Sequence, residues 1–246
     1  MSNLEASSRR CCMMDMLHNP IPMFTTGISL LGLFVILIIA LNPPMAHEDF
    51  PWRKPLVGSI FSLICVFGIL AIFFPKQCSE TLYFQKSERK HAPHSPSITI
   101  KGHHPDCEGF SDHVIHVGNH TVCAACAGLF IGALVALTGT ALYFFGGWPM
   151  AEVSSTGILI GAAGLLLGFC QMRFGGFIRS MLNAFFVLGA FLILIGIDGL
   201  FQSLSADIFL NGLIVFWILT RILLSQWDHR RICSACKSPC GIRESK

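Results

Sequence analysis

Charged residues are scarce in this sequence. Asp, Glu, Lys and Arg make up 13% of its 246 residues, whereas a soluble globular domain carries about 25%. The formal net charge is only +3. The composition therefore excludes an ordinary soluble domain, and the small positive charge gives no reason to expect a nucleic-acid partner.

Several catalytic motifs are missing as well. The chain has no H-E-x-x-H, P-loop, G-x-S-x-G or G-x-G-x-x-G pattern. Ionisable residues inside the apolar runs are few, with no series of carboxylates that would suggest a proton or cation path. Asp198 lies near the end of one run, where we expect a water-exposed helix terminus.

Apolar runs dominate what remains, because 53% of the residues are hydrophobic. A membrane-spanning helix needs about 20 apolar residues, and in lipid such a run must satisfy its own backbone hydrogen bonds as a helix. The sequence therefore predicts an all-α polytopic membrane protein, in contact with the lipid bilayer. Its six transmembrane helices are expected at residues 21–42, 56–74, 122–145, 153–170, 181–201 and 208–224. The last run is short, and Arg221 and Trp227 are expected to anchor its end.

Basic residues are distributed unequally between the loops on the two sides. The segments on the side of the two termini, with Arg221, hold 15 of the 17 Lys and Arg residues, and the other side holds only Arg53 and Lys54. Because positive loops stay inside, both termini are predicted to be cytoplasmic in a cell-membrane protein. The predicted parts are a tail (1–20), a transmembrane hairpin (21–74), a loop (75–121), a four-helix region (122–224) and a second tail (225–246).

Small residues recur every four positions in two of the runs. Such stripes allow helix backbones to approach closely in lipid, so they predict which helices pack together. The stripes contain Ala124, Gly128, Gly132, Ala136 and Thr140 in one run, and two pairs, Gly157 with Gly161 and Gly164 with Gly168, in the next.

Cysteine and histidine gather in the second part of the 75–121 loop, at 102–121, and at the start of the third run. A reducing cytoplasm argues against disulfides and favours metal or redox chemistry. Cys123 and Cys126 have the C-x-x-C spacing of a zinc knuckle. Just upstream, "HVIHVGNHTV" places two β-branched runs around Gly-Asn, which predicts a hairpin leading into the knuckle.

The predicted metal site is a structural zinc site on the cytoplasmic face, before the third helix. We expect Cys107, Cys123, Cys126 and one histidine to bind the ion, with His104 preferred over His103 and His113. His116 and His120 are further histidines in the same stretch. A possible second site, which could also complete the first, contains Cys233, Cys236, Cys240 and His229.

Two other functions remain open at this stage. The Cys123/Cys126 pair could serve a membrane thiol-disulfide oxidoreductase. A zinc enzyme acting at the membrane interface would instead need an acidic base, for which Asp106, Glu108 and Asp112 are available. The preferred hypothesis is a metal-stabilised scaffold, sensor or transport component.

The segment "CAACAGLFIG" resembles a family of uncharacterised prokaryotic integral membrane proteins. The signature of that family is an upstream Cys-His, followed by C-A-R-C-T-G-[IL]-Y-x-G entering a membrane helix. Ala125 and Ala127 replace its arginine and threonine, and Phe130 stands for its aromatic residue. The similarity covers about 100–205 and includes "DGLFQ", which resembles a D-G-x-T-Q element. It implies a metal knuckle and no particular substrate. The matching residues are Cys123, Ala124, Cys126, Gly128 and Gly132.

Overall fold

The computed structural model describes residues 20–41, 50–73, 100–101, 104–105, 111, 113–117, 120–148 and 154–235. Within these residues the fold is all-α, apart from two short pairs of β-strands. In these described ranges, six helices are long and apolar enough to cross a membrane. They are α2 (Pro20–Leu41), α3 (Arg53–Phe73), α5 (Ala124–Thr140), α6 (Ser154–Phe169), α7 (Gly176–Phe201) and α8 (Leu204–Ala235). The predicted number of spanning helices is therefore confirmed.

Two short helical segments extend the bundle helices. The π-helical turn η2 (Ala141–Phe145) continues α5, and the 3₁₀ turn η4 (Cys170–Arg173) continues α6. Both lengthen their helices toward the span that lipid requires. In η2, Tyr143 and Phe144 are buried, so this turn directs a polar aromatic side chain into the bundle.

Helix α7 lies at the centre of the bundle and packs along both α5 and α6. Its neighbours approach through small residues, as the sequence stripes predict. A Cβ atom added to Gly128 of α5 would lie 1.9 Å from the carbonyl oxygen of Ser180 in α7. On the other side, a Cβ atom on Gly161 of α6 would lie 2.6 Å from the carbonyl oxygen of Gly189. Only glycine permits these backbone contacts.

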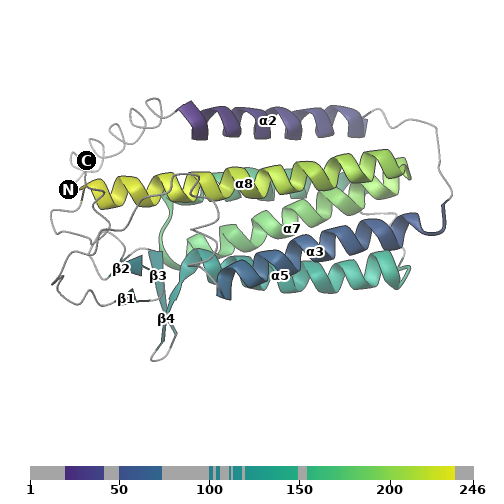
Figure 1. Ribbon diagram of the computed structural model, residues 1–246. Coiled ribbons are helices and arrows are strands. Elements are labelled where there is room, and N and C mark those ends of the chain that lie inside the picture. Colours follow the sequence, from purple (N-terminus) through teal and green to yellow (C-terminus); the bar gives the residue numbers. More distant parts are fainter. Residues whose placement is uncertain are drawn as a thin grey trace, which may run out of the picture.

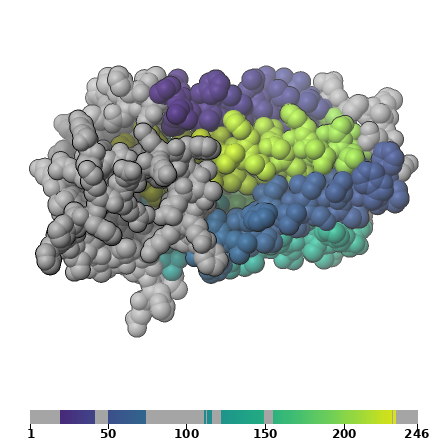
Figure 2. Space-filling model, viewed as in Figure 1, coloured from purple at the N-terminus to yellow at the C-terminus, as the bar shows by residue number. Residues whose placement is uncertain are grey.

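Helix α2 lies at the edge of the bundle, beside α8 (Figure 1). Figure 2 shows α2, α8 and α3 along one side of the molecule. Large apolar side chains cover the outer surfaces, which would be unfavourable in water and are suited to lipid. Examples from all six of these helices are Phe24, Leu31, Phe34, Phe67, Ile131, Leu159, Ile160, Phe177 and Phe209, all exposed.

Two helices extend beyond their expected ends and include charged residues that were expected in loops or tails. Helix α7 begins at Gly176, not 181, and so includes Arg179. Helix α8 continues to Ala235, so 225–235 of the predicted tail are helical and Arg221 lies well inside the helix. Arg221 is buried. It therefore faces the bundle and does not anchor a helix end at the membrane surface.

Four short strands lie at one end of the bundle (Figure 1). Strand β1 (Ile100–Lys101) pairs with β2 (His104–Pro105), and β3 (Val114–Val117) pairs with β4 (His120–Cys123), both antiparallel. In the second pair Val117 faces His120, so the two-residue connection falls at 118–119. The predicted hairpin is thus confirmed, and its second strand leads directly into α5.

Candidate functional site

The β3–β4 hairpin determines the position of Cys123. This residue ends β4, pairs with Val114 and is also the N-cap of α5, with extended backbone angles of φ −64° and ψ 124°. The residue is buried, with 6% of its surface exposed. The change from strand to helix at this residue brings Cys126, in the first turn of α5, to the same side as Cys123.

The two thiols form a pair beside an arginine. Cys126 and Cys123 interact through a side-chain hydrogen bond, and the guanidinium of Arg221 acts electrostatically on both sulfur atoms. Free N–H groups at the start of α5 add partial positive charge in the same place. The thiolate is the form of cysteine that binds metals and reacts with disulfides, and nearby positive charge compensates its negative charge.

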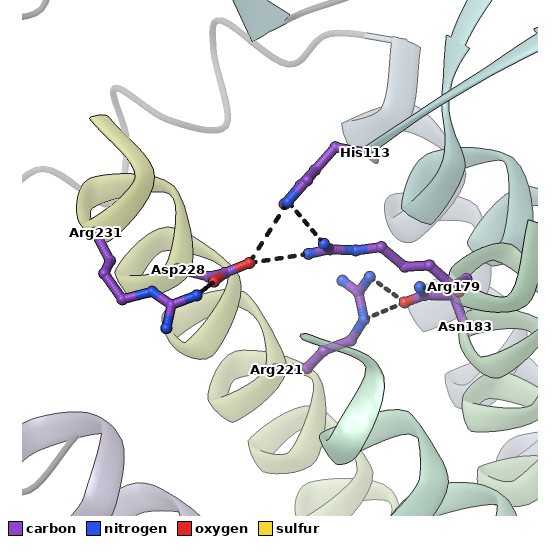
Figure 3. A network of polar contacts seen from close by, with 6 residues as sticks. All are labelled: His113, Arg179, Asn183, Arg221, Asp228 and Arg231. Carbon is purple, nitrogen blue, oxygen red and sulfur yellow. Dashed lines mark hydrogen bonds and ion pairs between the residues drawn. The ribbon is translucent and has the colours of Figure 1, made fainter. Parts of the chain in front are cut away.

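A buried polar network surrounds Arg221 (Figure 3). Arg221 donates through Nε and Nη2 to Oδ1 of Asn183 in α7, with Nε at 2.8 Å. Asn183 in turn donates to the carbonyl oxygen of Arg179 at 2.6 Å. The cysteine pair is thereby connected to α7 and α8 as well as to its own helix.

Asp228 is the acidic centre of the same network. Arg179 Nη1 donates to His113 Nε2 at 3.0 Å, and Arg179 Nη2 lies 3.4 Å from Asp228 Oδ2. Arg231 contacts the other oxygen of Asp228 at 3.2 Å. Figure 3 shows the side chains of His113, Arg179 and Asp228 directed toward one another. This contact holds the start of the hairpin against α7 and α8.

The predicted zinc ligands are only partly within the described residues. Cys123 and Cys126 are together, whereas Nε2 of His113 is directed to Arg179 and Asp228. His104 is described only as a backbone position in β2. In the described part of the chain, no three Cys, His, Asp or Glu side chains gather as a metal site would require. Outside the described residues lie His103, Asp106, Cys107, Glu108, Asp112, Cys236 and Cys240.

Of the predicted second site, only the side chain of His229 lies within the described residues. The ring of His229 lies near that of His113, with 5.7 Å between centroids. Cys233 lies one turn further along α8, where the backbone alone is described. His229 is therefore close to the hairpin and to the Asp228 network.

A second buried ion-pair cluster lies at the opposite end of the bundle. Arg53, the first residue of α3, contacts Asp198 Oδ1 at 2.6 Å and Asp207 Oδ2 at 2.5 Å, both through Nη1. Tyr143 of η2 donates to Asp198 Oδ2 at 2.7 Å. Asp198 is 0% exposed, so the expected water-exposed helix terminus was wrong. The α3 guanidinium reaches this carboxylate inside the bundle.

A pocket of about 410 Å³ opens next to this cluster, lined by Phe50, Pro51, Arg53, Lys54, Asp198, Gly199 and Gln202. Lys54 Nζ is 3.9 Å from Asp198 Oδ2 and lies 4.7 Å from the centre of the Tyr143 ring. Gln202 has a left-handed backbone, with φ 47° and ψ 37°, and its N–H bonds the carbonyl oxygen of Asp198 at 3.1 Å. Gln202 is the C-cap of α7, and a left-handed residue at this position ends the helix.

Sequence reasoning identified the cysteine pair but missed the charged partners from other helices. In the sequence, Arg53 and Lys54 indicate only the orientation, and Arg179 falls in an expected loop. A basic residue inside or next to a long apolar run is the signal that could have identified them, because buried charges need partners. Comparison of the chain with protein-family models, with curated proteins and with solved structures finds no match.

Proposed function

We propose that this chain is a multi-pass protein of the cell membrane with a structural zinc site at its cytoplasmic end. The ion is held by Cys107, Cys123, Cys126 and one histidine, and it fixes the 102–121 loop to the start of α5. The observation that supports this most strongly is the contact between the Cys123 and Cys126 thiols at the β4–α5 junction, beside buried Arg221. In this role the protein is a scaffold, sensor or transport component.

The charges of the neighbourhood suit such a site. Zinc bound by three thiolates and one neutral imidazole carries a net charge of −1, since metal-bound cysteines lose their protons. A buried negative centre is costly unless a positive group compensates it. The guanidinium of Arg221, which acts on both sulfur atoms, supplies that charge.

Among the candidate histidines, His104 fits better than His113. Nε2 of His113 accepts a hydrogen bond from Arg179 and faces Asp228, so binding zinc through this atom would require breaking the network of Figure 3. His104 lies in β2, between the β1 strand and Cys107 in the sequence. The proposed ligand set is therefore Cys107, Cys123, Cys126 and His104, with His103 as the neighbouring substitute.

Thiol-disulfide exchange is the second candidate function, because the same contact between two thiols next to an arginine would also suit a redox pair. Reactive cysteines are partly exposed. Cys126 is half-buried, whereas Cys123 is buried. The burial of Cys123 favours a closed structural site, as in four-coordinate zinc centres.

Elemental analysis of the detergent-purified full chain tests the proposal. The wild type should contain stoichiometric zinc, and the double variant Cys123→Ser with Cys126→Ser should contain none. A matched control, Cys65→Ser with Cys170→Ser, changes two described cysteines that are not among the proposed ligands and should keep its zinc. Equal metal content in all three proteins would overturn the proposal, and rapid alkylation of Cys126 in a zinc-free wild type would favour the redox function.

A further inference from the structure

We propose that the pocket at the start of α3 binds a small oxyanion, such as a carboxylate or a phosphate monoester. This site lies at the end of the bundle remote from the hairpin, and it is independent of the proposed zinc centre. Its volume of about 410 Å³ falls within the range of roughly 300–1,000 Å³ that is usual for small-molecule pockets.

The acceptor atoms of Asp198, the carboxylate that lines the pocket, are already engaged. Asp198 accepts a hydrogen bond from Arg53 on Oδ1 and another from Tyr143 on Oδ2. Its backbone carbonyl oxygen accepts a hydrogen bond from the N–H of Gln202. Asp198 is also fully buried. A ligand would therefore gain little by offering hydrogen-bond donors to this carboxylate.

The groups that line the pocket and can still bind a ligand are donors. Arg53 contacts both carboxylates through Nη1 alone, so the N–H groups on Nε and Nη2 are not used by these ion pairs. Lys54 is half-exposed, with 45% of its side chain accessible, and its ammonium touches Asp198 only at 3.9 Å. The Gln202 side chain adds an amide to the same lining. A guanidinium edge next to an ammonium is well suited to an oxyanion.

Helix α3 contributes to the same preference. Arg53 and Lys54 are its first two residues and both line the pocket. The partial positive charge of the helix N-terminus therefore lies beside the pocket. Phe50 and Pro51 line the remaining side and offer apolar contact. The best ligand is consequently an oxyanion with a short apolar part, either a free solute or the phosphate of a lipid headgroup.

Titration of the full chain in uncharged detergent tests the proposal, with binding followed by calorimetry. The probes are butyrate, inorganic phosphate and glycerol phosphate, with chloride at equal ionic strength as the reference. We expect saturable binding of at least one probe, weakened about tenfold by Lys54→Gln. Lys54→Arg should restore it, and Arg173→Gln, which removes an exposed cation outside the pocket, should leave it unchanged.

A second variant keeps the test independent of folding. Gln202→Gly preserves the left-handed backbone and removes the amide, so it should also weaken binding while the unliganded melting temperature is retained. Nanodiscs with and without phosphatidylglycerol distinguish the sources: binding that occurs only to that lipid, and is lost in Lys54→Gln, identifies a headgroup. The absence of saturable binding to every probe and lipid, or equal binding by wild type and Lys54→Gln, would overturn the proposal.

Discussion

Among the described residues, Arg53 is the one positive charge that contacts both buried carboxylates at one end of the bundle. Asp198 and Asp207 each lie within 2.6 Å of its Nη1 atom, and both are fully buried. The Arg53→Gln substitution would leave the two carboxylates without this partner. Removing one member of a buried ion pair costs about 3–5 kcal/mol, so we expect a large fall in the melting temperature in detergent.

The control for this substitution is the neighbouring residue. Lys54 is half-exposed and makes a longer contact, and exposed ion pairs contribute about 0–1 kcal/mol. Lys54→Gln should therefore leave the melting temperature nearly unchanged. Equal melting temperatures for Arg53→Gln and wild type would show that the cluster does not stabilise the bundle.

Arg221 is the residue that should tune the proposed metal site without binding the ion. If it compensates the charge of the zinc–thiolate centre, Arg221→Met should lower zinc affinity by about 10–100-fold, as outer-shell substitutions do. Zinc retained against a graded chelator measures this. Arg231→Met provides the control on the same helix, because Arg231 is partly exposed and pairs with Asp228. Zinc retention in Arg221→Met equal to that of wild type would contradict the assigned role.

At the residue scale, the sequence predicts contacts between residues that are close together along the chain. The C-x-x-C pair and the hairpin before it are separated by few residues, so the backbone alone brings them together. Arg53, Tyr143 and Asp198 come from three distant segments. Their contact depends on how α3, η2 and α7 pack, and spacing along the chain carries no information about it.

Gly128 is the closest helix-to-helix contact among the described glycines. Its missing side chain lets α5 approach the backbone of α7 at Ser180. Gly128→Leu should separate the two helices, and we expect a destabilisation of about 1–3 kcal/mol or more, as for an overpacked core. The loss should be visible as a lower melting temperature and as weaker resistance to protease.

Gly68 of α3 is a suitable control for this prediction. A Cβ atom added there meets nothing within 4 Å, so Gly68→Ala should be neutral or stabilising by about 0.5–1 kcal/mol, since alanine favours the helix. If Gly128→Leu were as stable as Gly68→Ala, the observed packing of α5 on α7 would be incorrect.

The number of helices could be predicted from the sequence because each apolar run has the length that lipid requires. The ends could not, because hydropathy treats a charge as the end of a helix. In α8, Arg221 and Asp228 find partners on α7, so the helix continues through them to Ala235. Helix α7 begins early for the same reason, with Arg179 in its first turn.

For the molecule as a whole, the unequal distribution of basic residues predicts the orientation in the membrane. The loop between α2 and α3 should face away from the cytoplasm, and the C-terminus should face it. Alkaline phosphatase inserted at 42–49 should be active in bacteria, whereas a fluorescent protein at the C-terminus should fluoresce. An insertion at 174–175, between η4 and α7, serves as the inside control and should give an inactive phosphatase. The opposite pattern would contradict the assigned orientation.

Zinc K-edge absorption of the purified full chain examines the central claim at the level of individual bonds. The account predicts a four-coordinate ion with three sulfur ligands at about 2.3 Å and one nitrogen ligand at about 2.0–2.1 Å. The Cys123→Ser variant should lose one sulfur ligand or the ion. A spectrum without zinc, or with zinc bound only through nitrogen and oxygen, would contradict the claim that the cysteines at the β4–α5 junction bind a metal.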